Sequence, residues 1–158
     1  MKVSIICVGK LKEKFYAEAV CEYKKRISRF AGLEIVELPD ERIPDNASEA
    51  ELQAVKRREG ERILAKIKPQ SYVISLCVEG KLLSSEELAE NISHACMGAS
   101  HIVFIIGGSL GLADEVKAAS DLRLSFGRMT LPHMLMRVVL AEQIYRAFMI
   151  NSGAAYHK

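Results

Sequence analysis

Two glycine-marked turns in the last third of the chain constrain its fold more than any other feature. The first, GGSLG at residues 107–111, follows the apolar run HIVFII, and the second, GRMTLP at residues 127–132, follows LRLSF. Each turn connects a short apolar strand to a helical pattern, which is the repeating unit of an α/β protein. Glycine carries no Cβ and tolerates positive φ, so both turns let the backbone approach a ligand closely.

Strands and helices alternate along the whole sequence. Runs rich in Val and Ile predict five strands, at residues 2–8, 33–38, 71–78, 101–106 and 122–125. Helical spacing predicts helices at residues 15–27, 48–68, 84–98, 114–119 and 134–150, two of which open on the capping boxes Ser48-x-x-Glu51 and Ser84-x-x-Glu87. A loop is predicted at residues 39–46, and a turn at Glu79-Gly80-Lys81. This pattern predicts a single-domain α/β fold with a mostly parallel sheet and helices on both faces.

Charge and composition narrow the function classes. The chain has 22 basic and 20 acidic side chains, a net charge of +2, which is far from the strong basicity of a free-standing nucleic-acid binder. If RNA is the substrate, a local patch or a preformed particle must provide recognition. The basic cluster Lys56, Arg57, Arg58 and Arg62 is interpreted as solvated charge, because Glu59 and Glu61 lie among these residues.

Neither a membrane segment nor a metal site is predicted. The N-terminal apolar run of about six residues is too short for a signal peptide, and no segment reaches the roughly 18 apolar residues of a membrane span. We therefore expect a cytoplasmic protein. The four cysteines, at positions 7, 21, 77 and 96, lack the spacing of zinc ligands, and we expect structural thiols.

The helix at residues 134–150 is apolar nearly all round. Its polar side chains are Arg137, Glu142, Gln143 and Arg146, and Arg137 lies opposite the other three. Such a helix must be buried on more than one side, so one part covers the sheet and the rest is predicted to meet a partner subunit in a homodimer. The tail at residues 152–158 shows no packing pattern and is predicted to be exposed.

The glycine turns also indicate the kind of ligand. In open α/β sheets, ligands bind outside the carboxyl ends of the strands, so both turns should line one crevice. One alternative is a nicotinamide oxidoreductase, but its GxGxxG motif follows the first strand, whereas these glycines follow the fourth and lack that spacing. A GxxxxGK[ST] phosphate loop is also absent. A cofactor held by main-chain contacts remains, and S-adenosylmethionine fits that description.

The sequence motifs carry a family resemblance. GGSLGL after FII, then TLPH, then MRVVLAEQIYRA and the terminal YHK resemble SPOUT-class methyltransferases that methylate N3 of a pseudouridine in 23S ribosomal RNA. The resemblance implies a C-terminal trefoil knot, a homodimer that completes each site, and a substrate within the ribosome. It places S-adenosylmethionine against these residues: Leu76, Gly108, Gly127, Arg128, Met129, Thr130, Leu131 and Pro132. The chain departs from the family at Ala155, where proline is frequent.

Several side chains are candidates for the chemistry that this resemblance implies. Those that could accept the N3 proton are His133, Glu142 and His157. Those that could bind phosphate or the developing oxyanion are Arg137, Arg146 and Lys158, and Tyr156 could stack on a base. Two structural alternatives stay open, namely that His133 caps a helix and that Glu142 and Arg146 form a salt bridge. A ribosome-associated binding protein without catalysis is a third class of function.

Overall fold

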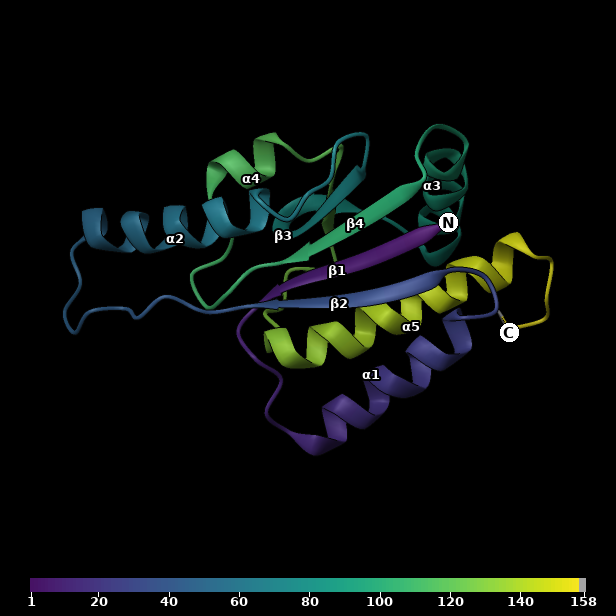
Figure 1. The fold of residues 1–158 in the computed structure, drawn as a ribbon, viewed down its shortest axis with the longest axis horizontal. Helices are drawn as coiled ribbons and strands as arrows, with labels where there is room; N and C mark the ends of the chain where they lie inside the picture. The colour runs from purple at the N-terminus through teal and green to yellow at the C-terminus, as the bar shows by residue number, and fades with distance from the viewer. Residues whose placement is uncertain (157–158) are drawn as a thin grey trace.

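The computed structural model describes residues 1–156, in which five strands and five helices alternate (Figure 1). The strands are β1 (Lys2–Val8), β2 (Gly32–Leu38), β3 (Tyr72–Leu82), β4 (His101–Ile106) and β5 (Leu122–Ser125). The helices are α1 (Lys14–Ile27), α2 (Glu49–Leu64), α3 (Ser85–Gly98), α4 (Asp114–Ala118) and α5 (His133–Asn151). Both predicted capping boxes are present, with Ser48 bonded to Glu51 and Ser84 bonded to Glu87.

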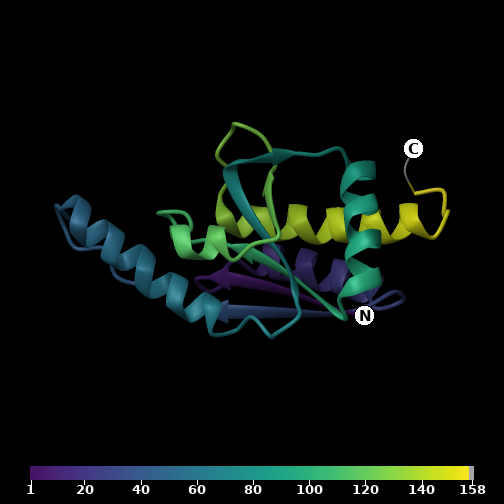
Figure 2. The ribbon, with the colours of Figure 1, turned by 90° about the horizontal axis from the view of Figure 1, so that it is seen from above.

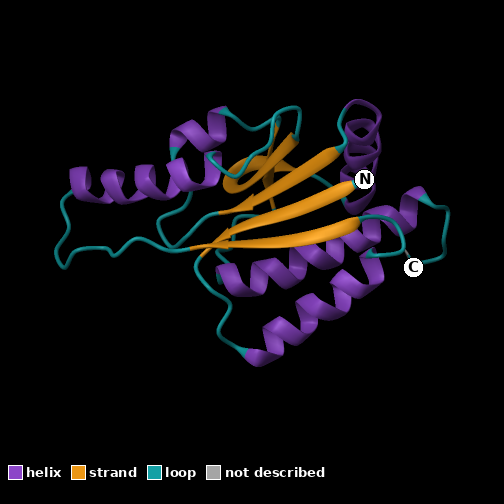
Figure 3. Ribbon diagram, viewed as in Figure 1, coloured by secondary structure: helices purple, strands orange, loops and turns teal. Residues whose placement is uncertain are grey.

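The sheet lies between two layers of helices (Figure 3). Its strand order is β2-β1-β4-β3-β5, and every pair is parallel. Alternate residues of the central strands point to opposite faces, so that Ile5 and Phe104 belong to one core and Ile6 and Ile105 to the other. Helices α1, α3 and α5 cover the first core, and α2 and α4 cover the second. The predicted fold class is confirmed.

Strand β3 differs from its prediction. We expected a turn at residues 79–81, but β3 continues through them to Leu82. It pairs with β5 first at Ile74 to Leu76 and again at Lys81 and Leu82. Between these points the Gly80 backbone packs directly against β5, where a Cβ would lie 2.7 Å from the Leu124 carbonyl carbon. Gly80 therefore permits close approach of two backbones, and the predicted turn is wrong.

Helix α5 packs beside both α1 and α3 along the first core. Its Arg137 is one of the few buried charged side chains among the described residues. The guanidinium donates to Glu37 Oε1 at 2.8 Å and to the Gly9 carbonyl at 2.7 Å. These bonds tie α5 to the carboxyl ends of β1 and β2. The sequence shows Arg137 opposite Glu142 on the helix, but its partners Glu37 and Gly9 lie 100 and 128 positions away.

The segment after α5 folds back on the helix. The Ala154 N–H donates to the Met149 carbonyl at 3.1 Å, and the Tyr156 ring meets the Tyr145 ring edge-on at 4.8 Å between centroids. The prediction of an exposed tail without packing is thus wrong at Tyr156, because its ring is partly buried and packs against Tyr145 of α5.

At the other end of the molecule, α2 extends away from the sheet (Figure 2). Among residues 1–156, none of the helices combines the length and the apolar character needed to cross a bilayer. The trefoil knot stays a prediction of the family resemblance.

Candidate functional site

A cleft of about 370 Å³ opens at the carboxyl ends of β4 and β5, beside residues 76–79 of β3. This is the edge at which open parallel sheets bind ligands, and the volume is within the usual range for a small-molecule site. Its walls include residues 76–79 of β3, the turn at residues 107–111, the turn after β5, and the first helical turn of α5. Both glycine turns therefore line one crevice, as predicted.

The first glycine turn is tightly closed. The Gly111 N–H donates to the Gly108 carbonyl at 3.1 Å, and Gly111 has a φ of +79°. A Cβ on Gly107 would lie 3.0 Å from the Gly111 carbonyl. A Cβ on Gly108 would point behind the turn, 3.1 Å from Glu59 Oε2 and 3.2 Å from Val8. Because Gly108 has no side chain, the turn can pack closely against Glu59 and Val8, and Gly108 itself lines the cleft.

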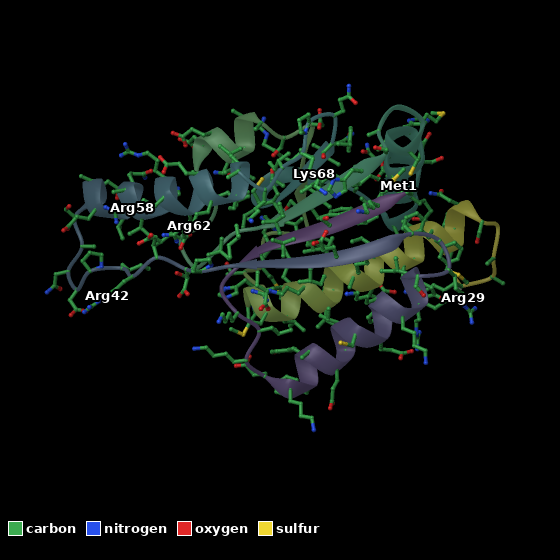
Figure 4. All side chains as sticks on the ribbon, in the orientation of Figure 1. Met1, Arg29, Arg42, Arg58, Arg62 and Lys68 are labelled. Carbon is green, nitrogen blue, oxygen red and sulfur yellow. The ribbon has the colours of Figure 1, made fainter. Side chains whose placement is uncertain are left out.

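Glu59 is a buried carboxylate behind this turn. It accepts a hydrogen bond from the Glu41 N–H at 3.1 Å, and burial raises its pKa above the ordinary value despite that bond. Glu41 in turn pairs with Arg62 and, at 3.8 Å, with Arg58. Figure 4 shows these two arginines on α2 beside the loop that carries Arg42. The 39–46 loop is therefore fastened to α2, directly behind the glycine turn.

The second turn also relies on glycine. Gly127 has a φ of +125°, and its N–H donates to Ser125 Oγ at 3.2 Å. The chain then passes along the cleft to His133, the first residue of α5. Pro132 holds the N-cap position and makes no side-chain capping bond. His133 is not the cap, and its imidazole lies next to the β1 end, 3.8 Å from where a Gly9 Cβ would stand.

Three charged side chains line the cleft besides the imidazole: Lys56, Glu79 and Lys117. Lys117 Nζ lies 2.5 Å from Glu79 Oε1. This bond lowers the pKa of Glu79 and raises that of Lys117, so both stay ionised at neutral pH. Of the described residues that line the cleft, only Glu79 is a carboxylic acid. The pair leaves Lys56 as the cation without an ion-pair partner among residues 1–156.

The structure brings together most of the residues predicted for the cofactor. Those that line the cleft are Leu76, Gly108, Gly127, Met129, Thr130 and Leu131, together with His133. Arg128 and Pro132 belong to the second turn but do not line the cleft. Arg137 is buried beneath it and is bound to its own chain.

The remaining predicted residues gather at the far end of α5. Arg146 binds Glu142 Oε1 through Nε at 2.9 Å, and this contact raises the pKa of Arg146. The same guanidinium lies 5.0 Å from the centroid of the Tyr156 ring. Arg146 lies 13 positions after His133 on the same helix, a rise of about 20 Å, so one chain cannot bring the two groups together. His157 and Lys158 lie outside the described residues.

Sequence reasoning missed four charged residues at the site. Glu79 and Lys117 are 38 positions apart in the sequence, so their pairing has no local signal. Because a turn was predicted at residues 79–81, Glu79 was not recognised as a strand residue that lines the cleft. Lys56 and Glu59 were interpreted as solvated charge because they belong to a mixed run. For Glu59, helical spacing was the signal of burial, since it lies on the same face of α2 as Val55 and Ile63.

The cleft fits the cofactor predicted from the sequence. Leu76, Leu124, Phe126 and Met136 provide apolar walls for a purine, and the glycine turns provide main-chain groups. Lys117 is neutralised by Glu79, which limits repulsion of a sulfonium. Within the described part of the chain, no cluster of three His, Cys, Asp or Glu side chains could hold a metal ion.

Comparison with known proteins agrees with this geometry. The family model described as "Predicted SPOUT methyltransferase" matches residues 1–157. Curated relatives from Lactococcus lactis subsp. cremoris and Lactiplantibacillus plantarum are 57% and 56% identical over 159 residues, with full coverage of both chains. Each is named "Ribosomal RNA large subunit methyltransferase H".

A solved structure shares the fold. It is described as a probable methylase family protein from Haemophilus influenzae Rd KW20, and it is 14% identical with a TM-score of 0.54 over 99% of this chain and 70% of that one. The glycine-lined cleft at the carboxyl edge, the full-length family match and these relatives lead to one conclusion: the chain belongs to the SPOUT methyltransferase family.

Proposed function

We propose that this protein transfers a methyl group from S-adenosylmethionine to N3 of a pseudouridine in large-subunit ribosomal RNA. The observation that carries the proposal is the cleft in which two glycine turns meet His133. The names of the 56–57% identical relatives support the ribosomal RNA substrate. The resemblance of TLPH, MRVVLAEQIYRA and the terminal YHK to the family motifs supports the pseudouridine target.

The cofactor would be held largely by main-chain groups. Gly108 and residues 127–131 would contact the adenosyl part through their backbones, and Leu76 would support the ring from β3. When bound, the cofactor supplies the electrophilic methyl group. In the transfer, the bond between that carbon and sulfur breaks, a bond to N3 forms, and the N3 proton must leave.

His133 is the group that we propose as the acceptor of that proton. Of the three candidates, His133 lines the cleft, Glu142 is paired with Arg146 about 14 Å along α5, and His157 lies outside the described residues. An imidazole nitrogen beside the cleft is the kind of group that acts as a general base. A positioned base of this kind contributes about 10²–10⁴-fold to a rate.

We further propose a homodimer built on α5. Helical spacing places five apolar side chains on the face of α5 away from the sheet: Met134, Leu135, Val138, Val139 and Met149. They lie outside the two core clusters, and Glu142 and Arg146 share their face. A two-fold axis near the middle of α5 would set the His133 end of one helix against the Arg146 and Tyr156 end of its partner. The two groups that one chain keeps about 20 Å apart would then form one site.

The substrate is proposed to be the assembled ribosome rather than free RNA. A net charge of +2 provides too little general attraction for a bare polyanion, so a preformed RNA surface must supply the complementarity.

Two measurements test the proposal. Calorimetry should detect S-adenosylmethionine binding, and labelled cofactor should transfer methyl groups to ribosomes that lack the modification but not to free RNA at a similar rate. Binding of NADH in place of S-adenosylmethionine would favour an oxidoreductase. Ribosome binding without methyl transfer would favour a non-catalytic binding protein.

A further inference from the structure

A cationic stretch with one exposed aromatic ring spans the connection from β1 to α1 and the start of α1. It is the segment KLKEKFY at residues 10–16, called the basic aromatic segment below. Lys10, Lys12 and Lys14 are exposed, and the Phe15 side chain is 63% exposed. The Phe15 and Tyr16 ring centroids lie 4.3 Å apart, so the two rings form one aromatic surface.

This segment begins beside the cleft. Gly9, which precedes it, lies against His133, and Arg137 of α5 binds the Gly9 carbonyl at 2.7 Å. The Leu11 N–H donates to Glu37 Oε1 at 2.8 Å, and Arg137 binds the same oxygen. The start of the segment is thus fixed to the first turns of α5. Phe15 lies six positions after Gly9, so even a fully extended chain keeps its Cα within about 22 Å of Gly9.

The charges around the rings distinguish between possible partners. Lys10 and Lys12 form no ion pair within the described residues, and Lys14 has only an exposed contact with Glu18 at 3.7 Å. A second copy of this chain would bring like charges together if the two segments met. Single-stranded RNA complements both the charge and the aromatic surface of the segment, because lysines contact RNA phosphates and aromatic rings stack on unpaired bases.

We propose that the basic aromatic segment binds unpaired nucleotides of ribosomal RNA that flank the target base, with Phe15 stacking on one base and Lys10 and Lys12 contacting phosphates. This inference rests on the proposed function and adds a substrate contact outside the cofactor cleft. It makes the segment a determinant of substrate affinity, while the chemical step stays with the cleft.

The test compares variants of the full-length protein in single-turnover methyl transfer to ribosomes that lack the modification. Phe15→Ala should raise the half-saturating ribosome concentration about tenfold or more, the usual effect of losing one stacked base, and should leave the maximal rate within about twofold. Phe15→Trp should restore wild-type affinity. The double variant Lys10→Gln and Lys12→Gln should lower the slope of log affinity against log salt by about 0.7 for each lost phosphate contact.

Matched controls identify nonspecific effects. Met97→Ala removes another highly exposed apolar side chain, on α3, and the pair Lys24→Gln and Lys25→Gln removes two cations from the far end of α1. Both controls should behave as the wild type does. S-adenosylmethionine affinity and sedimentation mass should be unchanged in every variant.

Three results would overturn the inference. The first is a Phe15→Ala variant whose ribosome affinity matches that of Met97→Ala. The second is a Phe15→Ala variant in which only the maximal rate falls. The third is a lower sedimentation mass for Phe15→Ala, which would show that a second copy covers the ring. In each case a wild-type enzyme that methylates ribosomes upholds the proposed function. A wild-type protein that transfers no methyl group refutes the proposed function itself.

Discussion

Replacing Gly80 by alanine should destabilise the protein and weaken cofactor binding together. The new Cβ would stand 2.7 Å from the Leu124 carbonyl carbon and 2.8 Å from Arg123 backbone atoms, and ordinary contact begins at 3.4 Å. The backbones of β3 and β5 would have to separate by about 0.7 Å, the difference between 3.4 and 2.7 Å. Because backbone cannot rotate away as a side chain can, we expect a loss of about 1–3 kcal/mol, as for an overpacked core.

This cost corresponds to a decrease of about 2–12 °C in Tm for a chain of this size. Thermal unfolding at a fixed protein concentration measures it, since the Tm of an oligomer depends on concentration. Calorimetry should show weaker S-adenosylmethionine binding, because Leu76, Glu79 and Leu124 on either side of Gly80 line the cleft. Gly32→Ala and Gly98→Ala are matched controls, since neither added Cβ meets any atom within 4 Å. A Gly80→Ala protein with the Tm and cofactor affinity of these controls would refute the close approach of β3 and β5.

Three further predictions follow from buried or paired groups. Arg137→Met should lower the free energy of unfolding by about 1–3 kcal/mol in denaturant titrations, because the Gly9 carbonyl loses its donor and Glu37 keeps only the Leu11 N–H. Arg137→Lys should recover only part of the loss, and an unchanged midpoint would contradict this. Burial raises the pKa of Glu59 in the folded state, so the stability linked to its protonation is present at low pH and is lost as pH rises through the raised pKa. Glu59→Gln should therefore lose less stability than the wild type over that pH interval, and parallel pH profiles of the two proteins would contradict the raised pKa. Deletion of residues 156–158 should leave S-adenosylmethionine affinity and sedimentation mass nearly unchanged, while methyl transfer to ribosomes falls by at least ~10²-fold. A truncated enzyme within a few-fold of the full-length rate would show that these residues take no part in the reaction.

The fold was predictable because its signals are local. Strands buried on both faces appear as apolar runs, so β1 and β4 were predicted with their observed bounds. The capping boxes at Ser48 and Ser84 place the starts of α2 and α3 through contacts three residues apart. The resemblance of the last third of the chain then identified the family.

Contacts between distant residues escaped prediction. A glycine between polar residues has the same local signature in a turn and in a strand that approaches another backbone, so Gly80 was misassigned. Arg137 was considered for the chemistry because the sequence could not show Glu37 and the Gly9 carbonyl as its partners. Glu79 and Lys117 meet only after β3 and α4 have assembled around the cleft.

We propose that the cleft between the two glycine turns is a methyl-transfer site with His133 at its edge. The most direct test is single-turnover transfer of labelled methyl groups to unmodified ribosomes by the wild type and by His133→Ala, followed by identification of the modified nucleoside. We expect one methyl group per ribosome at N3 of a pseudouridine, and a rate about 10²–10⁴-fold lower for His133→Ala with S-adenosylmethionine affinity retained. Transfer to a different atom, or an unchanged rate in His133→Ala, would contradict it.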